Sequence, residues 1–323
     1  MPTKIQRGAH HDVPLSNYAV EAFATGPTQG YIAQALFPVV PVQKETDRYY
    51  IIESNSWLQI HTGRRARRQA PNEVEWSVSS SNYVADNFAL RDANALEDLD
   101  NADAALDLRN TSADFVTNML LRGYEQRVAN IVTSISNCGS GVALTGGDKF
   151  SDFINSSPLS VVTTATAFLR KKTGLRPNVC AMDADTFDIL TRHPELLDMY
   201  QYTQGGPVLT SDIAKAFKVP SILVADGVYN SALTNVDSGD VGVGANIWGN
   251  FLFLGHVTPG ASMKVKSFGA TMRWTPQGIG TPMQAFRYLD PDPGTKKEWT
   301  EVGVYQDEKV VAKDLGYVVT GTL

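Results

Sequence analysis

The chain has 323 residues, of which 43% are hydrophobic, and its formal net charge is −6 at pH 7. This composition excludes a wholly disordered chain, and the length allows either two modest domains or one core with long extensions. The acidic balance gives no overall attraction to nucleic acid or to a membrane surface, so any contact with a polyanion has to come from a local patch.

Prolines interrupt the N-terminal region at positions Pro14, Pro27, Pro38 and Pro41. Proline in a helix interior removes a hydrogen bond and clashes with the preceding turn, so this spacing argues against a long regular element. We expect an N-terminal arm over residues 1–45 that is extended apart from one short helix near residues 31–36. Such an arm must find its apolar contacts on the body of the protein or on a neighbouring copy.

Apolar and aromatic residues alternate with polar ones on both sides of an arginine-rich centre between Arg48 and Val84. The pattern predicts an extended hairpin loop over residues 46–85, whose tip contains Arg64, Arg65, Arg67 and Arg68. A long two-stranded arm cannot bury both faces against its own domain and is marginally stable alone. We therefore expect the loop to lie on another copy of the chain, which indicates an assembly.

Next comes an acidic stretch, Asp86 to Asp107, which contains seven carboxylates and a single basic residue, Arg91. Apolar residues then recur at three- and four-residue steps and predict a helix over residues 106–136, ended by Asn137 and the glycines that follow. At 1.5 Å per residue this helix would be roughly 45 Å long, more than a compact domain needs. We interpret it as the spine of a domain over residues 86–149.

The arginine tip and the acidic stretch suggest that copies of the chain complement one another, because arginine forms bidentate pairs with carboxylates. The expected contact residues on the acidic side are Asp98, Asp100 and Asp103. Two other interpretations of the arginines stay open: they bind the phosphates of a nucleic acid, or they are a solvated turn.

From about residue 150, short helices alternate with buried strands and predict an α/β body over residues 150–271. Helices are expected over residues 161–172, 185–191, 194–199 and 212–217, and strands over 179–182, 221–225 and 247–257. Residues 272–323 predict strands that return to the first domain, with Asp307 and Glu308 as the turn between two of them. The segments 139–147 and 278–282 are rich in glycine or proline and are candidate hinges.

Little in the sequence indicates chemistry. The five histidines are scattered without metal-ligand spacing, and nucleophile-elbow, phosphate-loop and dinucleotide motifs are absent, so we expect neither an enzyme nor a cofactor. A hydrolase built on the body would need more than His193, Asp183 and Asp185, and the two aspartates more simply cap the helix that follows their strand. Cys138 and Cys180 form no disulfide framework, and the N-terminus has no secretory signal, so folding in a cytoplasm is expected.

Several phrases, taken in their order, carry a resemblance to a known family. They are Gly30-Tyr31-Ile32-Ala33 leading to Leu36-Phe37-Pro38, then Asp47-Arg48-Tyr49-Tyr50, then Thr173-Gly174-Leu175-Arg176-Pro177 and His193-Pro194-Glu195-Leu196. Together with the element order, they resemble the major capsid proteins of tailed bacteriophages. The resemblance implies the α+β Hong Kong 97-type fold, with a peripheral domain around the spine helix and an axial domain over residues 150–271.

What the resemblance implies for function is a shell protein. Pentamers and hexamers of the chain would form an icosahedral head around double-stranded DNA, with each extended loop lying over the peripheral domain of the next subunit. Some members weld the shell through a lysine on this loop, but the chain has no lysine between Lys44 and Lys149, so that cross-link cannot form. An encapsulin-type nanocompartment of the same fold is the alternative.

The expected partners follow from the same resemblance. They are further copies of the chain, a separate scaffolding protein, a portal, a decoration protein, and packaged DNA that is contacted non-specifically. No membrane contact is expected. The protein would be assembled in the host cytoplasm and would end in the virion.

Overall fold

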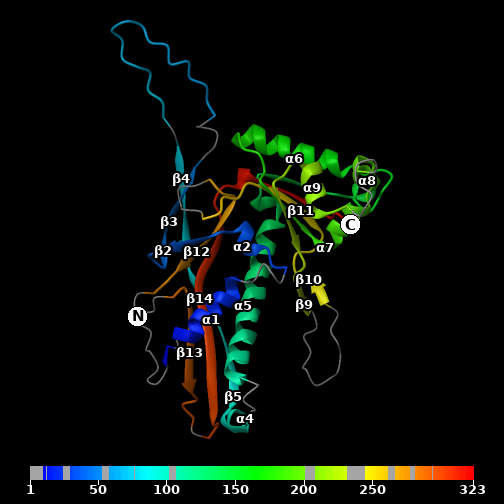
Figure 1. The fold of residues 1–323 in the computed structure, drawn as a ribbon. Coiled ribbons are helices and arrows are strands. Elements are labelled where there is room, and N and C mark those ends of the chain that lie inside the picture. Colours follow the sequence, from blue (N-terminus) through cyan, green and yellow to red (C-terminus); the bar gives the residue numbers. More distant parts are fainter. Residues whose placement is uncertain are drawn as a thin grey trace.

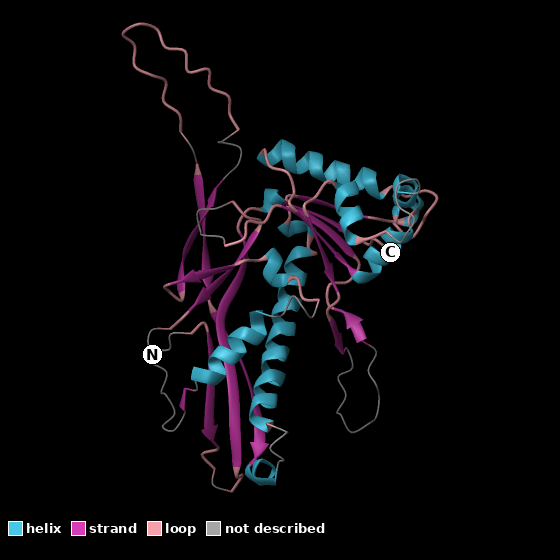
Figure 2. Cartoon of the chain, viewed as in Figure 1, coloured by secondary structure: helices cyan, strands magenta, loops and turns pink. Residues whose placement is uncertain are grey.

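The computed structural model describes residues 10–11, 13–24, 30–52, 58–75, 77–101, 107–200, 208–230, 244–260, 266–276, 281–292 and 294–323. The molecule is elongated, with one long helix, α5 (Leu108–Val132), along its axis, a sheet beside that helix, and a second sheet with its own helices at one end (Figure 1). Helices and strands are thus both abundant, and the two sheets are separate (Figure 2).

The first sheet lies beside α5 and is mainly antiparallel. Its strand order is β1-β13-β14-β12-β2, and β5 pairs with the other edge of β14. The strands are β1 (His10–His11), β2 (Val39–Val42), β5 (Asp86–Ala95), β12 (Gly269–Trp274), β13 (Met283–Leu289) and β14 (Lys297–Val310). Along much of its length, the long strand β14 therefore has β13 or β12 on one edge and β5 on the other.

The turn predicted at Asp307 and Glu308 is wrong. Strand β14 continues through both residues, which pair with Met272 and Thr271 of β12. The polar residues that suggested a turn do not lie on an exposed loop, because the side chains of Gln306 and Glu308 are buried. Buried polar side chains of this kind need partners from distant segments.

The N-terminal region is more regular than predicted. Helix α1 (Val13–Ala24) has 12 residues, buries Leu15, Ser16 and Ala19, and belongs to the same core as α5. Pro14 does not prevent it, because a proline in the first turn of a helix removes only an N–H group that has no partner within the helix. The short helix expected near residues 31–36 is confirmed as α2 (Ala33–Leu36).

The spine helix is confirmed with shorter bounds. Asp107 caps its start, accepting a hydrogen bond from the backbone N–H of Asn110 at 3.3 Å. The helix ends at Val132, and a 3₁₀ turn, η2 (Ile135–Asn137), follows. Between β5 and α5, part of the acidic stretch forms the six-residue helix α4 (Leu96–Asn101).

The second sheet has the order β6-β15-β11-β7-β8. Its strands are β6 (Ser140–Ala143), β7 (Val179–Asp183), β8 (Ser221–Ala225), β11 (Phe251–Gly255) and β15 (Gly316–Thr320). The four helices predicted for this region are confirmed as α6 (Pro158–Thr173), α7 (Ala184–Arg192), α8 (Pro194–Tyr200) and α9 (Thr210–Phe217). The expectation that the last strand returns to the first domain is wrong for β15, which pairs with β11 and β6.

The extended hairpin loop is confirmed only at its base. Strands β3 (Thr46–Ile52) and β4 (Val78–Val84) pair residue for residue, from Thr46 opposite Val84 to Ile52 opposite Val78. Residues 58–75 contain no strand. A second, smaller hairpin is formed by β9 (Val228–Asn230) and β10 (Gly244–Asn246), and the short 3₁₀ turns η3 (Gly146–Asp148) and η5 (Lys313–Leu315) complete the described elements.

One buried cluster joins the two sheets. It combines residues of α1, α2 and α5 with Val302 and Val304 of the first sheet and with Phe251, Phe253 and Val318 of the second. A second cluster packs α6 to α9 on the opposite face of the second sheet, and a third joins β3 and β4 to β2 and β12. The hydrophobic core is therefore continuous across the two sheets through α5.

Candidate inter-subunit surfaces

The extended loop projects away from the rest of the molecule (Figure 2). It leaves large apolar side chains uncovered: Ile60 is 93% exposed, and Leu58, Val74 and Tyr50 are also exposed. Several uncovered apolar side chains on one projecting segment are typical of a surface that a partner covers. The loop is therefore the strongest candidate for a surface that another chain covers.

The four tip arginines lie in the projecting loop, and all are exposed. None forms an ion pair with another described residue. Arg68 has a positive φ of 67°, which is uncommon for a residue with a side chain. The guanidinium groups are thus free to meet carboxylates or phosphates outside this chain.

The acidic residues form a smaller surface than the sequence suggested. Asp98 and Asp100 are exposed on α4, whereas Asp86 and Asp92 belong to β5, and Asp107 caps α5. Asp103 lies outside the described residues. The cation of Arg109 lies near these carboxylates and donates two hydrogen bonds, of 2.8 and 2.9 Å, to Glu298. The carboxylate of Glu298 is the main cause of the raised pKa of Arg109.

The structure does not bring the arginines and the acidic helix together within one chain. The loop leaves one end of the molecule and α4 lies at the opposite end (Figure 1). Any pairing between them must therefore join two copies. A contact between different surfaces of identical chains is head-to-tail, and it closes into a ring where its rotation permits.

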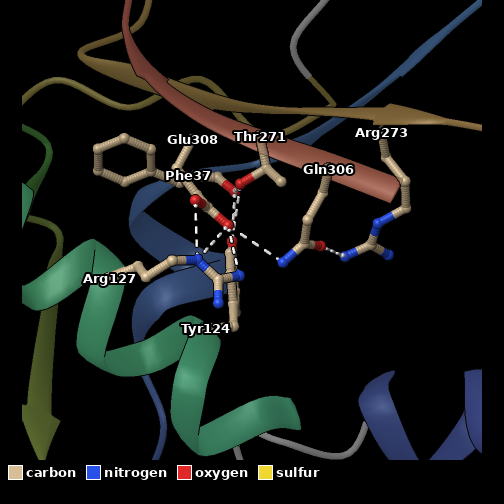
Figure 3. Close-up of polar contacts among 7 residues, drawn as sticks. All are labelled: Phe37, Tyr124, Arg127, Thr271, Arg273, Gln306 and Glu308. Atoms are coloured by element: carbon tan, nitrogen blue, oxygen red, sulfur yellow. Dashed lines mark hydrogen bonds and ion pairs between the residues drawn. The ribbon is translucent and has the colours of Figure 1, made fainter. Parts of the chain in front are cut away.

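A buried polar network holds α5 to the first sheet, and the sequence patterns did not reveal it (Figure 3). Arg127 of α5 donates to both carboxylate oxygens of Glu308, with Nη2 and Oε1 2.9 Å apart. Gln306 donates to the same carboxylate at 3.1 Å and accepts a hydrogen bond from Arg273 at 3.0 Å. The guanidinium of Arg127 also lies 3.7 Å from the ring centroid of Phe88 on β5.

Tyr124 extends this network one turn earlier on α5. Its hydroxyl lies 2.8 Å from that of Thr271, and both hydroxyls reach the backbone carbonyl of Phe37. Burial raises the pKa of Tyr124 well above its usual value. The side chains of one helix thus fix the positions of β12, β14 and the residue after α2.

Glu125 has a comparable role on the neighbouring face of α5. Its carboxylate accepts hydrogen bonds from the backbone N–H groups of Ile32 and Ala33 and from the indole of Trp248 at 2.7 Å. Burial raises the pKa of Glu125, and the three N–H donors oppose this change. The residue joins the spine helix to the N-terminal region and to the segment that leads into β11.

A serine–histidine pair among the helices that cover the second sheet does not form a catalytic dyad. Nδ1 of His193 accepts the backbone N–H of Glu195 at 3.2 Å, so the ring proton is on Nε2, which lies 3.0 Å from Oγ of Ser156. Ser156 donates its own proton to the carbonyl of Asp152 at 2.6 Å. Histidine is therefore the donor in this pair, which is the reverse of what a general base needs.

The expected capping role of Asp183 is confirmed, because its carboxylate accepts the backbone N–H of Thr186 at the start of α7. Asp185 instead accepts a hydrogen bond from the side chain of Asn246 at 2.8 Å. Within the described residues, no group of three or more His, Cys, Asp or Glu side chains could hold a metal ion. Likewise, no described helix is long and apolar enough to cross a membrane.

Comparison with known proteins gives one consistent result. No family model matches the chain. The major capsid protein of Pseudomonas phage JBD67 is 26% identical over 294 residues, which cover 88% of this chain and 90% of that protein. Among solved structures, a phage-related protein from Bordetella bronchiseptica RB50 is similar with a TM-score of 0.74 and 19% identity, over 97% of both chains. The capsid structure of cyanophage P-SCSP1u has a TM-score of 0.57 and 11% identity, over 88% of this chain and 86% of that chain.

Proposed function

We propose that this chain, a tailed-phage major capsid protein by its Hong Kong 97-type fold and its sequence relatives, assembles into pentamers and hexamers of an icosahedral head shell around double-stranded DNA. The observation that carries the proposal is the projecting loop with its uncovered apolar side chains, on a body that has the fold of capsid subunits. Within the described part of a single chain, these side chains stay largely exposed. A neighbouring copy supplies the missing surface.

The proposed domains follow the two sheets. The first sheet and α5 are the peripheral domain, and the second sheet with α6 to α9 is the axial domain that surrounds the five- and six-fold axes. The loop reaches over the peripheral domain of the next subunit. Without a lysine on the loop to form a covalent weld, the shell is held by buried area and by charge. Interfaces of obligate assemblies commonly bury more than about 2,000 Å².

We further propose that the arginine tip of one subunit binds the acidic helix α4 of a neighbour. Arg64, Arg65, Arg67 and Arg68 provide planar donors, and Asp98 and Asp100, with Asp103 as the third residue of the predicted set, provide carboxylates. Such pairs set the register and the partner of a contact more than its raw affinity. The free positions of both groups, at opposite ends of the molecule, support this arrangement.

Charge reversal tests the contact. Replacing the four arginines with glutamate should leave a folded, soluble subunit that forms no shells, as judged by circular dichroism and electron microscopy. The matched control replaces the same arginines with lysine, which keeps the charge and should keep at least part of the assembly. Normal shells from the glutamate variant would refute the contact.

The partner surface is tested by rescue. Adding Asp98→Lys, Asp100→Lys and Asp103→Lys to the glutamate variant should restore shells, because the two charges are then exchanged. If the rescue fails while the lysine control assembles, the tip binds elsewhere on the neighbour.

The remaining partners belong to the same proposal. A separate scaffolding protein, a portal and a decoration protein accompany the shell, and the packaged DNA is contacted without sequence preference. Assembly takes place in the host cytoplasm, and the mature location is the virion. The phage source of the sequence relative favours a head shell over a cargo compartment, and nuclease-resistant DNA inside particles from infected cells would distinguish the two.

A further inference from the structure

A groove runs between α6 and α9 on the surface of the second sheet's helical layer, with a volume of about 380 Å³. One face of α6, from Leu159 to Arg170, forms one wall, and the end of α9 at Ala216 and Phe217 forms the other. Met199 of α8, which is 49% exposed, adds to its apolar lining. The wall along α6 is roughly 16 Å long.

Cations gather at one end of this groove. Arg170, Arg176 and Lys218 line it and are exposed, and Lys171 and Lys172 are exposed beside Arg170. Among the described residues, none of these five forms an ion pair, and no carboxylate lines the groove. A chain with a net charge of −6 thus carries an unpaired positive cluster next to an apolar channel.

We propose that this groove, which we call the α6/α9 groove, docks an acidic amphipathic helix of a separate shell-associated protein, whose apolar side chains enter the channel and whose carboxylates meet the three cations. Helix-in-groove recognition uses apolar anchors one turn apart, and flanking charges fix the direction of the helix. The inference rests on the proposed shell function, because each subunit of a shell would then offer one such site. It does not depend on the arginine-tip contact.

The lengths of the segments favour a separate protein over a second copy. The acidic helix of the described chain, α4, has six residues and covers roughly 9 Å, about half of the groove. Other exposed acidic residues of the described chain that lie beside exposed apolar side chains are also in short segments, such as Glu73 to Glu75 around Val74 and Leu197 to Met199 around Asp198. None of these segments has the length of the channel.

The test uses assembled shells and a fluorescent helical peptide of about 15 residues, the length at which an isolated helix becomes stable. Leucines at helical spacing form its apolar face, and three glutamates are placed at one end. A matched peptide carries lysines in place of the glutamates. The acidic peptide should bind at one copy per subunit by fluorescence anisotropy, and the lysine peptide should bind at least about tenfold more weakly.

Two variants locate the site. Arg170→Glu with Lys218→Glu reverses the charge at its end, and Ala167→Phe fills its channel, since Ala167 is a half-buried lining residue of α6. Each should lower the affinity of the acidic peptide about tenfold while shells still form. Arg192→Glu, an exposed charge reversal on α7, should leave binding unchanged and is the control.

Three results would overturn the proposal. The first is equal binding of both peptides, or undiminished binding to the variants. The second is loss of assembly in the groove variants when Arg192→Glu assembles, which would mean that a second copy fills the groove. The third is displacement of the peptide by a DNA duplex. If that duplex no longer binds the charge-reversal variant but still binds Ala167→Phe, the positive cluster is a nucleic-acid site. If the unmodified chain forms no shells, the proposed function fails, and the same titration on the soluble subunit still decides the groove.

Discussion

Arg127 and Glu308 form a partly buried ion pair at the centre of the polar network between α5 and β14. The side chain of Glu308 is 6% exposed, so its charge depends on protein partners rather than on water. Such a pair adds little net stability over apolar residues, but removing one member leaves an uncompensated buried charge. The role of the pair in the fold is to fix the position of α5 on β14.

Replacing Arg127 with methionine should therefore lower the free energy of unfolding by about 3–5 kcal/mol. Adding Glu308→Gln should recover part of the loss, because the amide carries no charge. Arg64→Met, at an exposed loop arginine, should change stability by less than about 0.5 kcal/mol. Urea unfolding of the soluble subunit measures all three, and a cost below that of the control would contradict the role given to the pair.

His193 makes stability depend on pH. Burial lowers its pKa from the ordinary value of 6.5, although the nearby Glu195 opposes this. As pH falls below about 6.5, the unfolded chain takes up a proton more readily than the folded one. The free energy of unfolding should therefore decrease as the pH falls from about 6.5 to the pKa of His193 in the folded protein.

The comparison that isolates this effect is between His193→Gln and the unmodified chain at pH 7.5 and 5.5. The glutamine variant should lose less stability between the two pH values, and the urea midpoint is the measurement. His61→Gln, at an exposed loop histidine, should behave like the unmodified chain. An unchanged pH dependence in His193→Gln would show that other groups cause it.

The sequence predicted some residue roles and missed others for a clear reason. Asp183 could be assigned as a helix cap because a buried strand ends at it and a helix follows at once, which is a local signal. Glu125 and Glu308 find their partners 93 and 181 residues away. Nothing in the local pattern of a charged residue on a helix or strand reveals such a partner.

At the level of elements, α6 shows how local chemistry sets the bounds of a helix. Ser157 caps its start, Pro158 occupies the first turn, and Gly174 ends it in the left-handed conformation with a φ of 75°. A side chain at Gly174 would be strained and would also lie 3.2 Å from Leu58. Gly123, in the interior of α5, has a helical backbone and only the end of Arg127 within 4 Å of such a side chain.

The same substitution at these two glycines should consequently have opposite effects. Gly174→Ala should destabilise the subunit by about 1–2 kcal/mol, because alanine pays the left-handed penalty. Gly123→Ala should stabilise it by about 0.5–1 kcal/mol, because alanine loses less entropy in a helix. Thermal unfolding distinguishes the two signs, and stabilisation by Gly174→Ala would contradict the assigned helix end.

The prediction of elements succeeded where a periodic pattern was long and failed where one residue type was given too much weight. The spacing of apolar residues predicts α5, and the alternation of short helices with buried strands predicts α6 to α9. The proline pattern does not predict α1, although a proline in the first turn of a helix is compatible with it. Asp307 and Glu308 predict a turn, but pairing with β12 continues β14 through both residues. The first error is therefore one of local chemistry, and only the second depends on a tertiary partner.

At the scale of the whole molecule, α5 joins two sheets into one continuous core, which limits where the subunit can bend. The glycines proposed as a hinge near residues 139–147 have a packing role at their start. A side-chain carbon at Gly141 would lie 2.6 Å from the carbonyl oxygen of Val318, and one at Gly139 would lie 2.7 Å from the backbone of Asp314. These two residues let β6 and the turn before it approach β15 closely.

The general architecture could be expected from the sequence, but the relation of the candidate surfaces could not. The sequence pattern predicts the order of arm, loop, spine helix and α/β body. The placement of the arginine tip and α4 at opposite ends depends on how the chain folds back along α5, and no local spacing encodes it (Figure 1). That placement turns a charge pattern into a hypothesis about contact between copies.

The measurement that tests the central claim most directly is negative-stain electron microscopy of the purified protein, with sedimentation velocity on the same sample. A shell subunit should give closed polyhedral particles or ring-shaped capsomers, with sedimentation coefficients far above that of a 35.2 kDa chain. A compact monomer or dimer that persists at high protein concentration would contradict the proposed function.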